Sequence, residues 1–304
     1  MVRLVVKMVD GLVIVDKEPG WTSHDVVAKL RSVYGQKRVG HAGTLDPDAT
    51  GVLLVGLGRV TRLMRFLQAG KKVYRSTIQF GVATNTLDAA GEVTGEVAMT
   101  FTRSDLEAAL PQFVGDIKQI PPMVSAVKID GKRLYASARA GEVVARPPRP
   151  VTVYKFLLED FDDTKPGFPR ATVLVECSSG TYIRSLAADL GEALGGLGHI
   201  ATLRRVSSGS FEVEEAHTID SVIAAPSDCL LSPLIAMRDL DQVEVDSATE
   251  KLVSHGRRIC INQEEKNING PCAVVGSRGE LLAVYEPKEN EFVAAVVVSP
   301  GAGE

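Results

Sequence analysis

The 304-residue sequence predicts an α+β protein, with a mixed sheet flanked by helices and a small β-rich C-terminal domain. Segments with helical and strand periodicity come in irregular order, without the regular alternation that a doubly wound sheet requires. The length fits one large and one small domain. Short β-like runs separated by turn residues follow Asp239, so we expect domains at 1–238 and 239–304.

The N-terminal elements are predicted from apolar spacing and from capping residues. The apolar run 12–15 predicts a buried strand. Ser23 is expected to cap a helix, and Gly35 is expected to end it. Spacing then predicts a strand over 52–55, a helix over 60–68 and a strand with one polar face over 73–80.

The later elements follow the same logic. Ser104 and Glu107 have the spacing of a capping box, so a helix is expected to begin at Asp105. Strands are expected over 151–156 and 172–177, and a helix over 182–194. The C-terminal β-like runs are 273–275, 281–285 and 292–298.

Charge is unevenly distributed along the chain. The whole sequence has 34 Lys and Arg against 38 Asp and Glu, a formal net charge of −4. Residues 1–76 nevertheless carry a local balance of +7 and residues 117–149 one of +5, whereas residues 240–304 carry −5. Because phosphate binding depends on the charge of one face, the net acidity does not exclude RNA as a partner.

Composition and spacing argue against several other classes of protein. Apolar residues at 45% and charged residues at 24% exclude wholesale disorder. The four cysteines form no C-x-x-C pair, and the five histidines show no metal-ligand spacing, so we expect neither a metal site nor a disulfide scaffold. No apolar stretch approaches the roughly 20 residues of a membrane span. We expect a protein of the reducing cytoplasm.

The glycine- and threonine-rich segment 40–51 contains the leading catalytic candidate, Asp46. Its three glycines permit sharp turns and close approach of a ligand to the backbone. Pro47 favours an extended conformation at Asp46, which would hold the carboxylate in one direction. A pre-oriented carboxylate suits nucleophilic or electrostatic catalysis. Taken alone, the same residues also fit an ordinary Asp-Pro turn.

Two further candidates lie near ends of predicted elements. Arg184 comes where a strand ends and a helix begins, and it could orient a carboxylate or form a structural ion pair. Tyr74 lies beside basic residues at the start of an alternating strand, and it could stack on a base or fill a core. The residues alone indicate an α+β enzyme, with RNA as a candidate partner.

The motifs together resemble the TruB family of pseudouridine synthases over most of residues 11–215. They occur in the order found in that family, which makes coincidence improbable. The matching residues are Asp16–His24 (D-K-E-P-G-W-T-S-H), Arg38–Gly51 (R-V-G-H-A-G-T-L-D-P-D-A-T-G), Lys72–Tyr74, Gln119–Pro122 with Ser125, Ala126 and Lys128, then Gly131, Leu134, Tyr135, Ala138, Arg139, Gly180–Leu186 (G-T-Y-I-R-S-L) and Leu203–Arg205.

This resemblance implies the pseudouridine synthase fold, with a largely antiparallel sheet, and an enzyme that isomerises uridine at position 55 in the T-loop of tRNA. No cofactor, no metal, no membrane and no obligate protein partner are implied, and we expect a monomer. Its catalytic residues would be Asp46 as nucleophile, Tyr74 for base stacking and proton transfer at C5, and Arg184 as the partner of Asp46. Arg184 would then lower the pKa of Asp46 and keep it ionised.

The resemblance implies supporting roles for a second group of residues. Those expected to contact the substrate are Lys17, His41, Tyr182 and Leu203, with His41 holding the T-loop open. The RNA backbone would be bound by Lys37, Arg38 and Lys72. The resemblance also implies a C-terminal RNA-binding domain of the PUA type, for which residues 240–304 are unusually acidic.

Two alternatives to a synthase remain at this point. One is an RNA-binding protein without catalytic turnover. The presence of all three catalytic candidates argues against it. The other is a hydrolase of nucleosides that uses Asp46 and Asp48 as a pair of carboxylates. The sequence also leaves open whether Asp46 attacks the sugar, attacks the ring or removes a sugar proton.

Overall fold

The computed structural model describes residues 8–123, 128–129, 132–133, 145–260, 268–289 and 291–298. Much of the basic segment 117–149 lies outside the described residues. So do the following motif positions: Ser125, Ala126, Gly131, Leu134, Tyr135, Ala138, Arg139 and the side chain of Lys128. No helix in the described part of the chain is long and apolar enough to cross a membrane.

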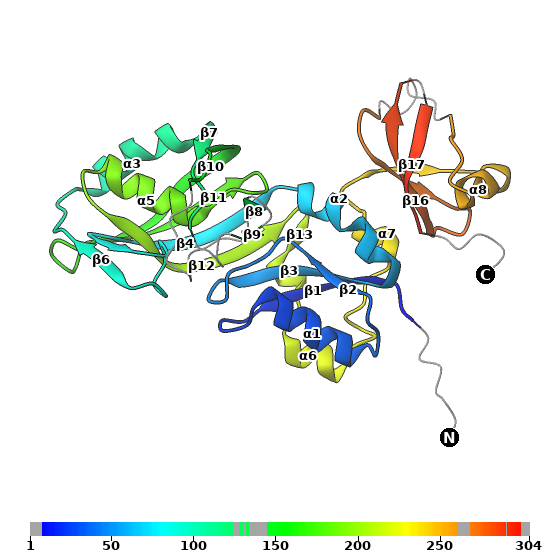
Figure 1. Ribbon diagram of the computed structural model, residues 1–304, viewed down its shortest axis with the longest axis horizontal. Coiled ribbons are helices and arrows are strands. Elements are labelled where there is room, and N and C mark those ends of the chain that lie inside the picture. The colour runs from blue at the N-terminus through cyan, green and yellow to red at the C-terminus, as the bar shows by residue number, and fades with distance from the viewer. Residues whose placement is uncertain are drawn as a thin grey trace.

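A nine-stranded sheet runs through the larger part of the molecule (Figure 1). Its strand order is β1-β3-β12-β4-β11-β10-β7, with β2 beside β3 and β13 beside β12. Neighbouring strands are antiparallel, except that β3 and β12 are parallel. The predicted mixed, largely antiparallel sheet is therefore confirmed. The strands are β1 (Gly11–Lys17), β2 (Val39–Ala42), β3 (Thr50–Leu57), β4 (Lys72–Phe80), β7 (Gly115–Gln119), β10 (Arg149–Asp162), β11 (Arg170–Cys177), β12 (Gly198–Ser208) and β13 (Phe211–Glu212).

Helices cover both faces of the half of the sheet that contains β1 and β3 (Figure 1). Helices α1 (Ser23–Val33) and α6 (Ile219–Ala224) lie on one face, and η1 (Gly58–Leu63), α2 (Met64–Ala69) and α7 (Pro233–Ala236) lie on the other. Alternate residues of β1 and β3 therefore enter two different cores. This burial on both faces explains why the two strands are continuous apolar runs.

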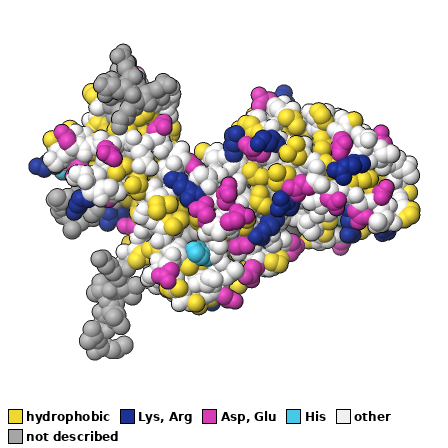
Figure 2. Space-filling view, turned by 180° about the vertical axis from the view of Figure 1, so that it is seen from behind, with side chains coloured by type: hydrophobic (Ala, Val, Ile, Leu, Met, Phe, Trp, Pro, Cys, Tyr) yellow, Lys and Arg dark blue, Asp and Glu magenta, His cyan; other side chains and the backbone are white. Residues whose placement is uncertain are grey.

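In the other half of the sheet, one face is covered and the other is polar. The covering elements are α3 (Arg103–Ala109), the short helix η2 (Leu110–Phe113) and α5 (Ile183–Ala193). On the uncovered face Arg75 pairs with Glu159 at 2.7 and 3.0 Å, and Lys71 and Lys155 both pair with Glu176. The side of the molecule opposite to Figure 1 shows Lys and Arg interspersed with Asp and Glu (Figure 2).

The N-terminal cap of α1 is Thr22, one residue before the predicted Ser23. Thr22 Oγ1 accepts a hydrogen bond from the backbone N–H of Asp25, and the Asp25 carboxylate accepts one from Thr22 N. Ser23 is buried, and its hydroxyl bonds to Leu45 instead. The predicted end is confirmed, since Gly35 follows the helix with a φ of +61°.

The predicted capping box of α3 is also displaced. Thr102 and Asp105 form the box, and the helix begins at Arg103, two residues before the predicted start. Both Thr102-x-x-Asp105 and Ser104-x-x-Glu107 satisfy the sequence rule. Backbone geometry selects the first pair, because Thr102 has the extended conformation that a cap requires.

Among the segments whose secondary structure differs from the prediction, two contribute residues near the centre of the molecule (Figure 1). The expected helix over 60–68 begins as the 3₁₀ helix η1, in which the Thr61 hydroxyl donates to the carbonyl of Gly58, and continues as α2. Strand β12 was not predicted at all, because its apolar residues do not alternate. It nevertheless lies between β3 and β4 and joins the two halves of the sheet.

The C-terminal part contains a four-stranded sheet with the order β14-β15-β16-β17 (Figure 1). All three predicted runs form strands there. We propose that residues 239–304 form a second domain, because they enclose a core of their own. Arg59 and Arg62 hold it to η1 by donating to the carbonyls of Val298 and Val297. Its elements are β14 (Asp241–Glu244), α8 (Ser247–Ser254), β15 (Cys272–Val275), β16 (Leu281–Lys288) and β17 (Glu291–Val297).

The remaining elements are short. Two small two-stranded sheets lie outside the main one, and a single 3₁₀ turn follows β13. They are β5 (Val82–Thr84) with β6 (Val93–Glu96), β8 (Lys128–Ile129) with β9 (Lys132–Arg133), and η3 (Val213–Glu215).

The parallel contact of β3 with β12 requires glycine at position 51. Gly51 has a φ of +98°, and a Cβ there would collide with the backbone carbonyl of Arg205. We predict that Gly51→Ala lowers the free energy of unfolding by about 3 kcal/mol, from backbone strain and steric overlap together. Gly40→Ala is the control, because its Cβ would meet only Thr61 at 3.9 Å. It should cost less than about 1 kcal/mol in urea unfolding, and equal losses would contradict the prediction.

Candidate active site

The loop between β2 and β3, which carries Asp46, is held by three side chains from other elements. Arg205 Nη2 donates to the carbonyl of Gly43 at 3.0 Å. The Ser23 hydroxyl accepts from the backbone N–H of Leu45 at 2.9 Å and lies 3.2 Å from its carbonyl. Lys17 Nζ donates to the carbonyl of Pro47 at 2.7 Å. These bonds fix the loop on both sides of Asp46, so the carboxylate is pre-positioned.

Lys17 acts on this loop and not on the cavity. Its side chain is 0% exposed, and its ammonium also donates to the carbonyls of Glu18 and Trp21. Burial lowers the pKa of Lys17 to about 8. Since three carbonyls engage the three ammonium protons, this side chain does not extend toward a ligand as the sequence suggested.

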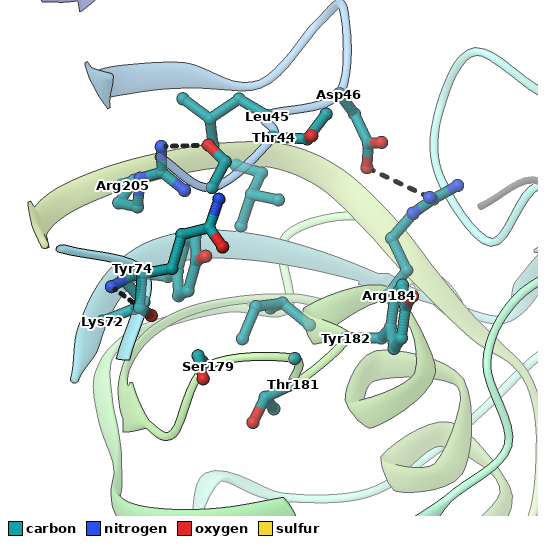
Figure 3. Close-up of a pocket in the computed structure, with 15 residues that line it drawn as sticks. Thr44, Leu45, Asp46, Lys72, Tyr74, Ser179, Thr181, Tyr182, Arg184 and Arg205 are labelled. Carbon is teal, nitrogen blue, oxygen red and sulfur yellow. Dashed lines mark hydrogen bonds and ion pairs between the residues drawn. The ribbon is translucent and has the colours of Figure 1, made fainter. Parts of the chain in front are cut away.

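Arg184 connects two aspartates that are distant in sequence. Its Nη2 lies 3.1 Å from Oδ2 of Asp46 (Figure 3). Its Nη1 lies 3.1 Å from Oδ2 of Asp88. Nη1 also donates to the carbonyl of Thr86 at 3.0 Å. The Arg184 side chain is 6% exposed, whereas that of Asp46 is 43% exposed. The buried guanidinium thus orients a carboxylate that remains accessible from one side.

The start of helix α5 presents Tyr182 and Arg184 to the same space. Tyr182 is the N-cap residue, and no side chain caps its helix. Gln119 holds the backbone of Tyr182 from both directions, accepting from its N–H at 2.9 Å and donating to its carbonyl at 3.2 Å. The amide of Gln119 is buried, so these bonds are shielded from water.

A cavity of about 390 Å³ lies between the Asp46 loop, β4, β12 and the start of α5 (Figure 3). Five of the predicted site residues beside Asp46 line it: Lys72, Tyr74, Tyr182, Arg184 and Leu203. Arg205 and Gln68 line it as well. A second cavity of about 350 Å³ lies on the other side of the Asp46–Arg184 pair, where Asp48, Thr86 and Asp88 line it. Both volumes are those of small-ligand sites.

The pKa of Asp46 is raised above the ordinary aspartate value. Burial is the largest cause, and Asp88 and Asp48 add to it, while Arg184 and Lys17 oppose it. Arg184 lowers the pKa of Asp46, as expected. Burial outweighs this effect, so the pKa is raised overall. The outcome is a carboxylate that is more basic than an exposed aspartate.

Tyr74 and Arg205 form a pair at the other end of the cavity (Figure 3). They are cross-strand partners on β4 and β12. Burial raises the pKa of Tyr74, and the positive charge of Arg205 counteracts this. The pairing of β4 with β12 thus sets a cation beside a half-buried tyrosine.

Lys72 lines the cavity but uses its ammonium elsewhere. Nζ donates to the carbonyls of Gly70, Gln68 and Leu67 at 2.8 to 3.4 Å and thereby caps the C-terminal end of α2. Burial lowers its pKa to about 8, and Arg205 contributes to this shift. Contact of Lys72 with the RNA backbone stays a prediction, and it would require the ammonium to leave these carbonyls.

His41, Lys37 and Arg38 lie outside the cavity lining. His41 is on β2, with its ring 5.5 Å from that of His24. Its Nδ1 is buried without a hydrogen-bond partner among the described residues, and burial lowers its pKa to about 4. Lys37 and Arg38 are exposed just before β2. Arg38 is five residues from Gly43, a distance of about 17 Å along an extended chain.

Sequence reasoning did not assign a role to two important residues. Asp88 lies in a turn with no recognisable motif, and it joins the site only through Arg184. Arg205 belongs to a quoted motif, but its burial could not be foreseen from an Arg-Arg pair. Among the described residues, no cluster of three or more His, Cys, Asp or Glu side chains is arranged to hold a metal ion.

Comparison with known proteins gives consistent results. The family model "TruB family pseudouridylate synthase (N terminal domain)" matches residues 31–183, and the "tRNA pseudouridylate synthase B C-terminal domain" matches 184–233. The chain is 43% identical to a tRNA pseudouridine synthase B of Thermobifida fusca, over 95% of this chain and 99% of that protein. It is 42% identical to one of Corynebacterium aurimucosum, over 95% and 96%.

Solved structures support the fold. A chain of a Cbf5–Nop10–Gar1 complex aligns with a TM-score of 0.72 at 24% identity, covering 96% of this chain and 85% of that one. A chain of an H/ACA RNP bound to a substrate RNA that contains 2′-deoxyuridine aligns with a TM-score of 0.71 at 22% identity, over 96% and 86%.

The electrostatics of Asp46 can be tested directly. We predict that its carboxyl carbon, followed by NMR in labelled protein, titrates above the ordinary aspartate pKa of about 3.9. Arg184→Gln should raise this pKa further, because it removes the opposing positive charge while burial remains. Asp105, an exposed cap residue whose pKa is lowered by its bonds to Thr102, serves as the internal control and should not respond. A fall of the Asp46 pKa in Arg184→Gln would refute this account.

Proposed function

Since this chain belongs to the TruB family of pseudouridine synthases, we propose that it isomerises uridine to pseudouridine at position 55 in the T-loop of tRNA. The name of its relatives, tRNA pseudouridine synthase B, supports tRNA as the substrate. We place the reaction in the cytoplasm, where tRNA would be encountered.

The observation that carries this proposal is the Asp46–Arg184 pair at 3.1 Å in the wall of a cavity. The reaction breaks the bond from N1 to the ribose, turns the uracil and joins C5 to the same ribose carbon. It needs one reactive carboxylate beside the sugar and a surface on which a detached uracil can be retained. The cavity offers Asp46 for the first, and Tyr74, Tyr182 and Leu203 for the second.

We assign roles to these residues from their positions. Asp46 would attack the sugar or the ring, or remove a sugar proton, and its raised basicity favours each route. Arg184 keeps the carboxylate ionised and directed at the cavity. Tyr74 would stack on the base and take part in proton transfer at C5. Tyr182 and Leu203 would form the walls around the base.

Extraction of the uridine from the T-loop is energetically feasible at this site. Unstacking a base costs a few kcal/mol, least where the base is already weakly held. Stacking on one aromatic ring returns about 1–3 kcal/mol. His41 would assist from outside the cavity, since an uncharged imidazole can insert between bases without desolvation of a charge.

The positive N-terminal segment supports binding of the tRNA backbone. Lys37 and Arg38 are exposed just before β2, the strand that leads into the Asp46 loop, where a stem adjoining the T-loop could reach them. Several other cations of residues 1–76 are committed to internal bonds, including those of Lys17 and Lys72. We therefore assign contact with phosphates to Lys37 and Arg38, and positioning of the active-site loop to Lys17.

The proposal predicts the effect of two neighbouring carboxylates on tritium release. A tRNA T-loop transcript labelled with tritium at C5 of uridine should lose the label with wild-type protein. Asp46→Asn should reduce the rate by at least about 10⁴-fold, as loss of a covalent or basic catalyst does. Asp48→Asn is the matched control, because it removes a charge of the same loop that lines the second cavity and not the one with Tyr74, and it should change the rate by less than about tenfold.

The alternatives give different results in the same assay. A nucleoside hydrolase would release free uracil and would depend on Asp48 as strongly as on Asp46. A binding protein without turnover would retain the tritium and still bind the transcript. Release at the wild-type rate by Asp46→Asn would exclude the proposed catalytic role.

The proposed binding of phosphates predicts a change in salt dependence. The slope of log Kobs against log salt should decrease in magnitude by about 0.9 for each duplex phosphate that Lys37→Gln or Arg38→Gln no longer neutralises. Arg103→Gln is the control, since Arg103 lies on α3 and pairs with Glu107 at 2.8 Å. Unchanged slopes for both variants would remove these residues from the interface.

A further inference from the structure

Arg205 is a buried cation without a carboxylate partner. It is 1% exposed and is the largest fully buried side chain described. Nε donates to the carbonyl of Val52 at 2.7 Å and Nη2 to that of Gly43 at 3.0 Å. Within the described part of the chain, no carboxylate forms an ion pair with it. Because an unpaired buried charge is costly, its presence beside a reaction cavity calls for a functional explanation.

The neighbour that could use this charge is Tyr74. The two residues are opposite each other on β12 and β4, the central strands of the sheet, and both line the cavity. A register shift in β12 follows directly after Arg205, between Arg205 and Ser207. Figure 3 shows both residues at the end of the cavity away from Asp46 and Arg184. The bulge and the cross-strand pairing therefore place a guanidinium next to a half-buried phenol.

The proposed reaction requires a stage at which negative charge develops on this phenol. After C5 has bonded to the ribose, the C5–H bond must break, and its electron pair forms the C5=C6 double bond. The electron pair of the C6=N1 bond returns to N1, which ends with a proton. For Tyr74 to accept the C5 proton, its phenol first gives its own proton to N1, directly or through water, and becomes a phenolate. Its oxygen is electron-rich between these two transfers.

We propose that Arg205 is a positioning residue for Tyr74, which orients the phenol and stabilises negative charge on its oxygen while the C5 proton is transferred. This inference rests on the proposed function of the cavity and deepens it. It assigns the two ends of the cavity to different steps. Asp46 and Arg184 serve the glycosidic bond, and Tyr74 and Arg205 serve the proton at C5. Fixed donors aimed at developing charge are a common source of rate enhancement.

The alternative is that Arg205 only clamps the Asp46 loop through the carbonyl of Gly43. The two accounts differ in the step that slows when Arg205 is replaced. Loss of a clamp displaces Asp46 and slows cleavage of the glycosidic bond. Loss of support for Tyr74 slows removal of the C5 proton, which makes the rate sensitive to deuterium at C5.

The test uses the full-length protein and a T-loop transcript with protium or deuterium at C5 of the target uridine. In single-turnover experiments, Arg205→Met should lower the rate about 10²- to 10³-fold with unchanged RNA affinity. Its deuterium isotope effect should exceed that of the wild type. Arg205→Lys, which keeps the charge, should recover part of the rate. Arg204→Met is the matched control, because Arg204 pairs with Asp16 at 2.7 Å and does not line the cavity.

A double-mutant cycle with Tyr74→Phe completes the test. If Arg205 acts through Tyr74, the two substitutions are far from additive, and Arg205→Met has little further effect in the Tyr74→Phe protein. The inference would be overturned if the Arg205→Met protein reacted slowly but kept the wild-type isotope effect, or if the effects of the two substitutions on the rate were fully additive. If Arg205→Met does not fold, the isotope effect and the cycle of Arg205→Lys decide by the same criteria. Failure of the proposed function is distinct, since the wild type would then make no pseudouridine.

Discussion

The ion pair between Asp46 and Arg184 joins the two halves of the molecule. Asp46 belongs to a loop of the half that is built on β1 and β3, whereas Arg184 begins a helix that covers the other half. These halves meet where β3 pairs with β12, the parallel contact of the sheet. A 3.1 Å contact between their ends can persist only if the sheet transmits position from one half to the other. Gly51 and the buried strand residues therefore matter for the site as much as for stability.

The electrostatics of the site follow from an unusual use of cations. Three buried basic side chains surround the Asp46 loop, and all three donate to backbone carbonyls: Lys17, Lys72 and Arg205. They organise the backbone but neutralise little of the carboxylate charge directly. Arg184 has to compensate Asp46 and Asp88 together. The pKa of Asp46 is consequently raised, mainly by burial, so its carboxylate is more basic than that of an exposed aspartate, which suits a nucleophile or a base.

The sequence predicted the parts of the fold that depend on regular patterns. The alternation in β4 and the apolar stripe of α5 gave correct elements, because each has one buried and one open face. Strand β12 escaped prediction since Arg204 and Arg205, one ion-paired and one buried, interrupt its apolar pattern. Spacing alone identified Asp46 as a candidate, while its partnership with Arg184 came from the family resemblance. Asp88 had no signal, because its role exists only in three dimensions.

The charge of a residue did not predict its role either, because that role depends on where the folded chain places the side chain. Lys17, Lys37 and Lys72 are indistinguishable as lysines in a basic segment, but only Lys37 is exposed. Some basic residues of the acidic C-terminal domain are also engaged in contacts within the protein. Two of its arginines, Arg258 and Arg278, pair with carboxylates of the same domain. It is attached by Arg59 and Arg62 of η1 and by apolar residues such as Leu281 that pack into the core beside β1 and β3. Attraction of a polyanion must therefore arise mainly from the catalytic domain. The exposed basic residues of that domain matter more for this attraction than the formal net charge of −4 suggests.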